Sequence, residues 1–240
     1  HVKSLWGGTM RVGTIGMLGD MVSSTNRDRY LALGAGSDLT AVTYYPLNGD
    51  FTVRDPSVVA ADFDSLTSIY TSAPIWFTEA GYPTGALCNS SEQRQAEFIT
   101  AVFEAWDAHA EEIEHIDFAW MHDQDSATVA QWVIDYTMSG QPGADVFAEY
   151  LATLGMRTED GNDKAGFVQL VEETRLRGWH SLSTMPPGTM SRRAGIPGNV
   201  RIVNGTVSVD DVRAPEALRV CACTLDGRVV CRSRVLQSLL

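Results

Sequence analysis

Short apolar runs alternate with amphipathic helical patterns along the first three quarters of the chain. The runs are rich in residues that favour strands, and Gly, Pro or polar residues bound them. Each is too short for a helix, and each is followed by a segment whose apolar positions have helical spacing. The predicted strands cover residues 11–15, 39–45, 75–78 and 116–121.

The helical patterns fill the intervals between these strands. Pro56 favours a first helical turn, and apolar residues then recur every three or four positions up to residue 70. Ser90 and Gln93 have capping-box spacing and predict the start of a helix that ends near His109. Residues 16–20 and the acidic segment 111–114 are expected to be loops. Further helices are predicted over residues 25–33, 129–136, 145–154 and 164–177.

Four strand–helix pairs in succession predict βαβ units and a parallel sheet. They amount to half of an eight-stranded barrel, and a half sheet leaves two long open edges. The alternative, a small open α/β sheet, is disfavoured because no glycine-rich phosphate loop follows any predicted strand. We therefore expect an α/β fold: a partial (β/α)8 TIM barrel of about four βα units, whose first half is missing from this chain.

The composition changes near residue 181, which predicts a domain boundary. Residues 181–198 contain MPPG and GIPG sequences typical of a linker. Residues 199–240 contain four short strand-like runs, with hairpin signals at Asn204-Gly205 and Asp226-Gly227. The predicted organisation is a half barrel over residues 1–180, a linker, and a small β appendage over residues 199–240.

Charge and composition exclude some classes of function. The 240-residue chain is 44% hydrophobic, which is typical of a globular protein, and its net charge of −12 argues against a nucleic-acid partner. No apolar run reaches the ~18 residues of a membrane span. The chain starts with His1, so we expect any targeting segment to be removed or to lie upstream.

The cysteines and the polar loops predict no metal or cofactor. Cys88 stands alone, and Cys221, Cys223 and Cys231 lack zinc-type spacing, although Cys231 can pair with either neighbour in an oxidising compartment. The segment HDQD at residues 122–125 offers oxygen and nitrogen ligands, but a solvated loop is the favoured interpretation.

Glu79 is the main candidate for chemistry. It follows the apolar run of residues 75–77, and Gly81 and Pro83 end the strand just beyond it. An unpaired ionised carboxylate costs several kcal/mol to bury, so a Glu at the end of a buried strand needs partners or a task. In parallel α/β barrels, catalytic residues stand at this end of the strands.

Residues 75–83, with the sequence IWFTEAGYP, resemble the seventh strand of clan A retaining β-glycosidases. Residues 38–46 (DLTAVTYYP) are similar to the sixth strand of these barrels, and residues 116–120 (IDFAW) to the eighth. The segment from 154 to 179 looks like the close of such barrels. The resemblance covers about residues 10–179 and includes galactanase-like, cellulase-like and β-glucanase-like families.

The resemblance implies roles for several residues. Glu79 corresponds to the nucleophile, and Trp120 to the platform under the sugar. A tyrosine hydroxyl next to Glu79 comes from Tyr44 or Tyr45, because alternate strand residues face opposite ways and the sequence does not fix which faces inward. Tyr82 and His122, in the loops after the same strands, are further candidates for substrate binding.

The general acid/base of this family follows the fourth barrel strand, usually as Asn-Glu, and the chain contains no such dipeptide. We expect that residue to lie upstream of His1. Asp20, Asp123 and Asp125 are weaker substitutes within the chain. The residues at the four strand ends are expected to converge, because parallel crossovers place them on one face of the sheet.

Two functions of different classes follow. The first is a secreted glycoside hydrolase that cleaves β-linked oligo- or polysaccharides by a retaining double displacement, with the acid/base absent from this chain. The second is a non-catalytic carbohydrate-binding or cell-surface protein derived from such a barrel; an inert fragment is a third reading. The tail is faintly similar to C-terminal sorting modules of exported bacterial enzymes, which implies a secreted or cell-surface location.

Overall fold

The computed structural model describes residues 10–179 and four strands of the tail: Asn199–Val203, Thr206–Asp210, Leu218–Cys223 and Val229–Val235. The chain divides into two compact units, His1–Gly178 and Trp179–Leu240. The functional candidates all lie in the first unit.

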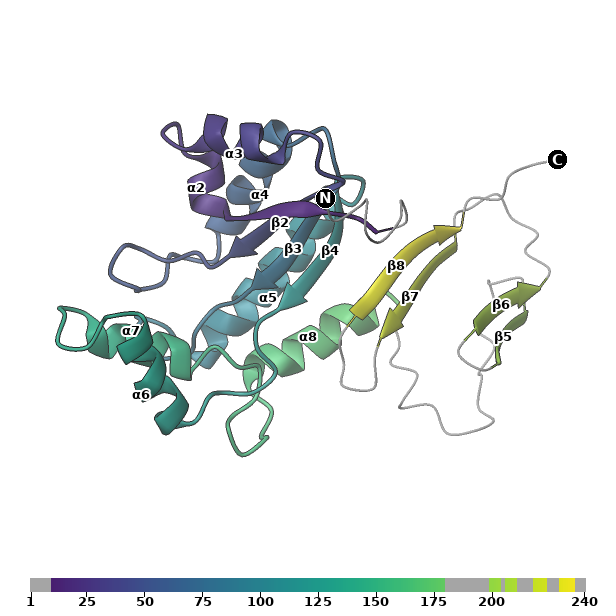
Figure 1. The fold of residues 1–240 in the computed structure, drawn as a ribbon. Coiled ribbons are helices and arrows are strands. Elements are labelled where there is room, and N and C mark those ends of the chain that lie inside the picture. Colours follow the sequence, from purple (N-terminus) through teal and green to yellow (C-terminus); the bar gives the residue numbers. More distant parts are fainter. Residues whose placement is uncertain (1–9, 180–198, 204–205, 211–217, 224–228, 236–240) are drawn as a thin grey trace. The chain divides into compact units, whose positions relative to one another are not determined.

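The first unit alternates strands and helices, in violet to green in Figure 1. Its elements are β1 (Gly13–Met17), α2 (Leu18–Val22), α3 (Arg27–Gly34), β2 (Leu39–Tyr44), α4 (Val58–Ile69), β3 (Ile75–Ala80), α5 (Glu92–Ala108), β4 (Ile113–Phe118), α6 (Ser126–Asp135), α7 (Ala144–Ala152) and α8 (Ala165–Leu176).

The four strands form one sheet in the order β1-β2-β3-β4, and every neighbouring pair is parallel. The predicted fold class, α/β with the βα units of a partial (β/α)8 barrel, is confirmed. In this part of the chain β1 and β4 are the two edge strands. Because all four strands are parallel, their C-terminal ends and the loops that follow them lie at the same edge of the sheet.

One face of the sheet packs against α4 and α5. Phe77 of β3 stacks on Phe63 of α4 at 4.5 Å between ring centroids, and both are fully buried. Tyr44 packs between them and Phe98 of α5. Because strand residues alternate, the neighbours of these core residues, among them Tyr45 and Trp76, belong to the opposite face.

That opposite face is the one a closed barrel would turn inward. Gly16 of β1 faces the helices, since a Cβ there would lie 2.5 Å from the ring of Tyr30. Its neighbours Ile15 and Met17 therefore point to the other face, where they are 56% and 58% exposed.

Side chains from the two edges of the described sheet meet across it. Arg11, next to β1, forms an ion pair of 2.8 Å with Glu114 of β4, and its guanidinium lies 4.9 Å from the ring of Trp76 on β3. The Trp76 indole N–H also donates to Glu114 Oε2 at 2.9 Å. These contacts join β1, β3 and β4 near their N-terminal ends.

Three local predictions were wrong, each for a physical reason. Residues 18–22 form a helix rather than a loop, because Leu18 and Met21 are buried on one side of it. Strand β4 begins at Ile113, within the acidic segment, since Ile113 is fully buried while Glu114 points away. The cap of α5 is Ser91, whose side chain accepts a hydrogen bond from the Arg94 amide, and not Ser90.

The tail forms two antiparallel pairs, β5 (Asn199–Val203) with β6 (Thr206–Asp210), and β7 (Leu218–Cys223) with β8 (Val229–Val235). The hairpin signals at 204–205 and 226–227 and the linker over 181–198 lie outside the described residues. None of the helices described here is long and apolar enough to cross a membrane.

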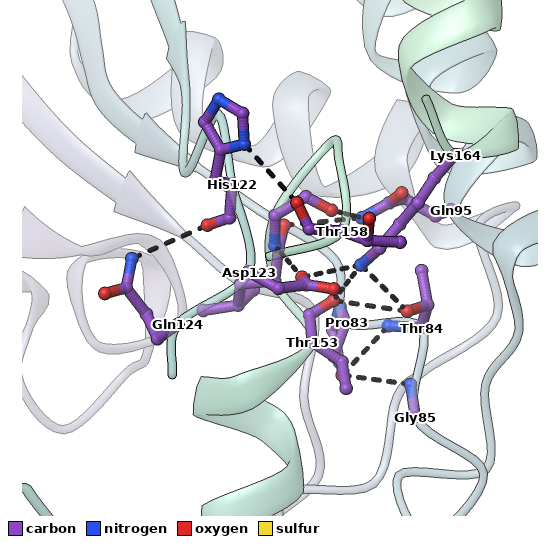
Figure 2. Close-up of polar contacts among 12 residues, drawn as sticks. Pro83, Thr84, Gly85, Gln95, His122, Asp123, Gln124, Thr153, Thr158 and Lys164 are labelled. Carbon is purple, nitrogen blue, oxygen red and sulfur yellow. Dashed lines mark hydrogen bonds and ion pairs between the residues drawn. The ribbon is translucent and has the colours of Figure 1, made fainter. Parts of the chain in front are cut away.

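A buried ion pair joins the loops at the C-terminal edge of the sheet (Figure 2). Lys164 is 3% exposed, and its ammonium lies 2.6 Å from Oδ1 of Asp123. It also donates to Thr84 Oγ1 at 3.1 Å and to the Thr153 carbonyl at 3.2 Å. Thr84 follows β3, Asp123 follows β4, and Thr153 follows α7, so one ammonium holds three loops together.

Gln95 of α5 also connects these loops. Its side-chain amide donates to the carbonyls of Tyr82, Leu154 and Gly155. The Gly155 amide in turn donates to Asp123 Oδ1 at 2.9 Å. Burial raises the pKa of the Asp123 carboxyl, while the Lys164 ammonium and the Gly155 N–H oppose that shift.

Replacing Lys164 by methionine is expected to lower the free energy of unfolding by about 3–5 kcal/mol, because it leaves the Asp123 carboxylate without its buried partner. Urea unfolding measures the change. Arg175→Met is the matched control, because the Arg175–Glu172 pair is exposed, and its removal should cost less than about 1 kcal/mol. Equal losses in the two variants would contradict the assigned role of Lys164.

Candidate active site

Glu79 lies at the C-terminal end of β3, as the sequence predicted, and its side chain is exposed. Strand β3 pairs with β2 through Val42 and Phe77, after which the register shifts and Thr43 pairs with Glu79. This irregularity changes the alternation at the end of β3. Glu79 therefore faces the same side of the sheet as Tyr45, the residue directly after β2.

Tyr45 is the tyrosine that meets Glu79. Its hydroxyl donates to Glu79 Oε2 at 2.8 Å. Tyr44 lies on the helix-covered face, where it is 2% exposed and donates to Asp62 Oδ2 at 2.9 Å. The choice that the sequence left open is thus decided by which face of β2 the helices cover.

The ring of Tyr45 is held on two sides. Tyr150 of α7 packs edge-on against it, with 5.8 Å between centroids and an interplanar angle of 88°. On another side, Gly81 leaves room for the ring, since a Cβ on Gly81 would lie 2.6 Å from Tyr45 Cε1 and 3.0 Å from the Ala119 carbonyl. Gly81 is therefore needed where β3, Tyr45 and the end of β4 meet.

Burial keeps these phenols protonated. It raises the pKa of Tyr45 well above the usual value for tyrosine, and the neighbouring Tyr150 and Glu79 raise it further. Tyr150 is affected in the same way by burial and by the Glu79 charge. A phenol that stays protonated is a constant hydrogen-bond donor, so the hydrogen bond from Tyr45 holds the Glu79 side chain in place.

Trp120 follows β4 and is half-buried. Its ring lies 5.3 Å from that of Trp132 on α6, with an interplanar angle of 46°. The peptide bond between Ala119 and Trp120 is cis. The Ala119 amide donates to the Ala80 carbonyl at 2.9 Å, and Ala80 adjoins Glu79, so the backbone places Trp120 beside the end of β3.

The other two predicted site residues are not brought to Glu79 by any contact in the described structure. Tyr82 is fully buried, stacks on Phe98, and donates to the Arg54 carbonyl at 2.7 Å, so it is part of the helix-covered core. His122 is exposed in the loop after β4, and its Nδ1 lies 3.3 Å from the Thr158 carbonyl.

The substitutes for a general acid have other partners. Asp125 caps α6 and accepts hydrogen bonds from the Ala127 and Thr128 amides; the Thr128 side chain and these amides lower its pKa. Asp123 is paired with Lys164. Asp20, in α2 after β1, accepts a hydrogen bond from Asn26 at 3.3 Å. Nothing in the described structure places any of the three beside Glu79.

Sequence reasoning missed the aromatic residues around Tyr45. Phe51 stacks on Tyr150 at 6.0 Å, and Phe147 contacts Phe51 at 4.8 Å and Tyr136 at 5.6 Å. Phe147 and Tyr150 have helical spacing and are typical of core residues, so no pattern linked them to Glu79. Among the described residues, no group of three or more His, Cys, Asp or Glu side chains is arranged to bind a metal ion.

No protein-family model matches the chain, and no curated protein matches it. Similar solved structures include a β-glucuronidase from Ruminococcus gnavus in complex with D-glucuronic acid (15% identity, 74% of this chain, 27% of that chain, TM-score 0.45). A second is a GH128 endo-β-1,3-glucanase from Lentinula edodes (12% identity, 65% of this chain, 54% of that chain, TM-score 0.39). A third is a thermostable mutant of a xylanase from Cellvibrio japonicus (12% identity, 69% of this chain, 49% of that chain, TM-score 0.41).

These similar structures are glycoside hydrolases, and the chain spans between about a quarter and about half of their length. With TM-scores below 0.5, the likeness adds no weight to the assignment of the fold or the site. The fold class follows from the parallel sheet itself, and the site from the contacts of Tyr45, Glu79 and Trp120.

Gly81→Ala is expected to displace the Tyr45 ring, because the new methyl group overlaps it, and to break the hydrogen bond to Glu79. Overpacking of this kind costs about 1–3 kcal/mol of unfolding free energy. Urea unfolding and a crystal structure of the variant measure both effects. Gly34→Ala is the control, since its Cβ would lie at an ordinary 3.5 Å from Thr14 Oγ1. An unmoved Tyr45 ring would disprove the assigned role of Gly81.

Stability is expected to fall as the pH rises above about 10, the ordinary pKa of tyrosine. Tyr44, Tyr45 and Tyr150 have raised pKa values because they are buried, so above that pH the unfolded chain loses protons that the folded chain keeps. The Cys88 thiol, whose pKa burial raises to about 12, adds to the same trend.

Urea unfolding between pH 8 and pH 11 measures this dependence. Tyr45→Phe should make the decline shallower, because one buried ionisable phenol is removed while its ring is kept. A free energy of unfolding that stays constant or rises over this range would show that the three phenols are not buried in the folded protein.

Proposed function

We propose that the chain forms the nucleophile half of a retaining β-glycoside hydrolase, with Glu79 as the nucleophile. The observation that supports this most directly is the 2.8 Å hydrogen bond from Tyr45 to Glu79 Oε2 at the C-terminal edge of a parallel sheet, beside Trp120. The exposed carboxylate is accessible to a ligand, and the indole offers an apolar plane to one face of a pyranose.

In this mechanism the Glu79 carboxylate attacks the anomeric carbon of a β-linked sugar. The bond to the leaving oxygen breaks as the bond to the carboxylate forms, and that oxygen takes a proton from a general acid. Water then attacks the same carbon, gives its proton to the conjugate base, and releases Glu79 and a sugar of retained configuration. Oε1 is the attacking atom, since Oε2 accepts the Tyr45 hydrogen bond.

The second carboxyl group must lie about 5–5.5 Å from Glu79. Asp123 and Asp125 are engaged by Lys164 and by the amides of α6, and Asp20 by Asn26. We therefore assign the general acid/base to a residue outside the described part of the chain. Secretion of the protein remains a prediction of the sequence.

A carbohydrate-binding protein without hydrolysis is the second candidate. Asp123 is paired with Lys164 and Asp125 accepts hydrogen bonds from the first turn of α6. These contacts favour the binding protein, because Glu79 then has no acidic partner among the described residues. In that case Trp120 and the neighbouring aromatic rings bind sugar, and the Tyr45–Glu79 pair accepts hydrogen bonds from its hydroxyl groups.

The test uses 2,4-dinitrophenyl β-glycosides of glucose, galactose, xylose, mannose and glucuronic acid. Their leaving group departs without protonation, so a nucleophile suffices and the missing acid is not needed. With one or more of these sugars, the chain is expected to release a burst of about one dinitrophenolate per molecule. Intact and peptide mass spectrometry should place the sugar on Glu79.

Glu79→Gln should abolish the burst, whereas Asp20→Asn and Asp125→Asn, which make the same change at the other carboxylates, should keep it. Loss of the burst in Asp20→Asn together with its survival in Glu79→Gln would refute the assignment of the nucleophile. Sugar binding without a burst for any of the five glycosides would establish the second candidate instead.

A further inference from the structure

Helix α6 carries aromatic residues that are not buried in the core. Val129 is the buried residue of this helix, while Ile134 and Tyr136 are 59% and 64% exposed. Trp132 and Tyr136 are four residues apart, so they project from the same side of the helix. A surface helix usually turns its aromatic residues inward, and α6 instead leaves Tyr136 open to solvent.

The first of these rings continues the surface of Trp120. The centroids of Trp120 and Trp132 are 5.3 Å apart and their planes are inclined by 46°. Trp120 comes directly after β4 and Trp132 from the helix that follows. Two indoles from consecutive elements therefore form one apolar surface next to the end of β3.

The second ring is fixed in place and lies near the same site. Tyr136 closes α6, where its amide donates to the Trp132 carbonyl at 2.8 Å. Its ring packs edge-on against Phe147, with 5.6 Å between centroids and an angle of 76°. Phe147 contacts Tyr150, which contacts Tyr45, so rings in contact lead from Tyr136 back to Glu79.

Electrostatics agree with this placement. Tyr136 is near enough to Tyr45 and to Tyr150 to contribute to the upward shift of the pKa of both phenols. Tyr136 therefore lies near the Tyr45–Glu79 pair, as its ring contacts through Phe147 and Tyr150 also indicate, and Trp132 lies against Trp120.

We propose that Trp132 and Tyr136 form a second sugar subsite beside Trp120, so that the ligand is a chain of at least two pyranose residues rather than a single glycoside. The inference rests on the proposed binding of a sugar at Trp120. A pyranose presents C–H groups on its faces and hydroxyls at its rim, which suits an exposed aromatic plane surrounded by water.

The expected ligand is a neutral chain. The described residues that contribute rings to this subsite carry no charge, and the charged residue within α6 beyond its cap is Asp135. An anionic polysaccharide would need Lys or Arg nearby to pair with its carboxylates or sulfates. A chain of neutral pyranoses needs the stacking surface alone.

The test measures binding of hexasaccharides and disaccharides of β-1,4-xylose, β-1,4-glucose, β-1,3-glucose and β-1,4-galactose by titration calorimetry. At least one hexasaccharide is expected to bind more tightly than its disaccharide. Tyr136→Ala and Trp132→Ala should each weaken that hexasaccharide about 3- to 10-fold, the range expected for one lost aromatic contact.

Ile134→Ala is the matched control, because Ile134 is equally exposed on the same helix and lacks a ring. It should leave binding unchanged. Tyr136→Leu keeps apolar bulk against Phe147 and separates stacking from folding: with unfolding free energy preserved, it should weaken binding as Tyr136→Ala does.

Several results would overturn the inference: hexasaccharides bound no more tightly than disaccharides, no binding in the whole panel, or equal losses in Ile134→Ala and Tyr136→Ala. The test is separable from that of Glu79. A failed dinitrophenolate burst with length-dependent binding intact removes the hydrolase proposal and keeps the subsite. A burst on Glu79 with binding that does not depend on chain length keeps the hydrolase proposal and removes the subsite.

Discussion

The buried ion pair between Lys164 and Asp123 is the constraint on which the arrangement of the site depends. Lys164 precedes α8, whereas its partners follow β3, β4 and α7, so its ammonium connects segments that are far apart in the sequence. A charge this deeply buried is tolerated only when all its hydrogens have acceptors, and here they do. The loops that follow Glu79 and Trp120 are therefore held in one fixed relation.

In the described part of the chain, helices cover only one face of the sheet. Parallel sheets are normally covered on both faces, and here the helices cover one while Ile15 and Met17 on the other are exposed. The Arg11–Glu114 ion pair joins the two edge strands of the described sheet near their N-terminal ends. Tyr45 and Glu79 lie at the C-terminal edge of this second face, and the backbone places Trp120 beside the end of β3.

Much of this was predictable from the sequence, and the limits have physical causes. The apolar runs located β2 and β3 and hence Glu79, because buried strands and their glycine and proline ends leave clear signals. The start of β4 was misplaced because Glu114 interrupts its apolar run on the uncovered face. Tyr44 and Tyr45 were indistinguishable until the covered face was known. Tyr150 and Tyr136 reach the site through packing between helices, which no local pattern encodes.

The most direct test of the account is a crystal structure of the protein after reaction with the 2-deoxy-2-fluoro analogue of a glycoside that it accepts. Electron density is expected to be continuous between the anomeric carbon and Glu79 Oε1, with Tyr45 still donating to Oε2 and the sugar ring over the Trp120 indole. A sugar joined to Asp20, Asp123 or Asp125, or a Glu79 turned away from Tyr45, would contradict it.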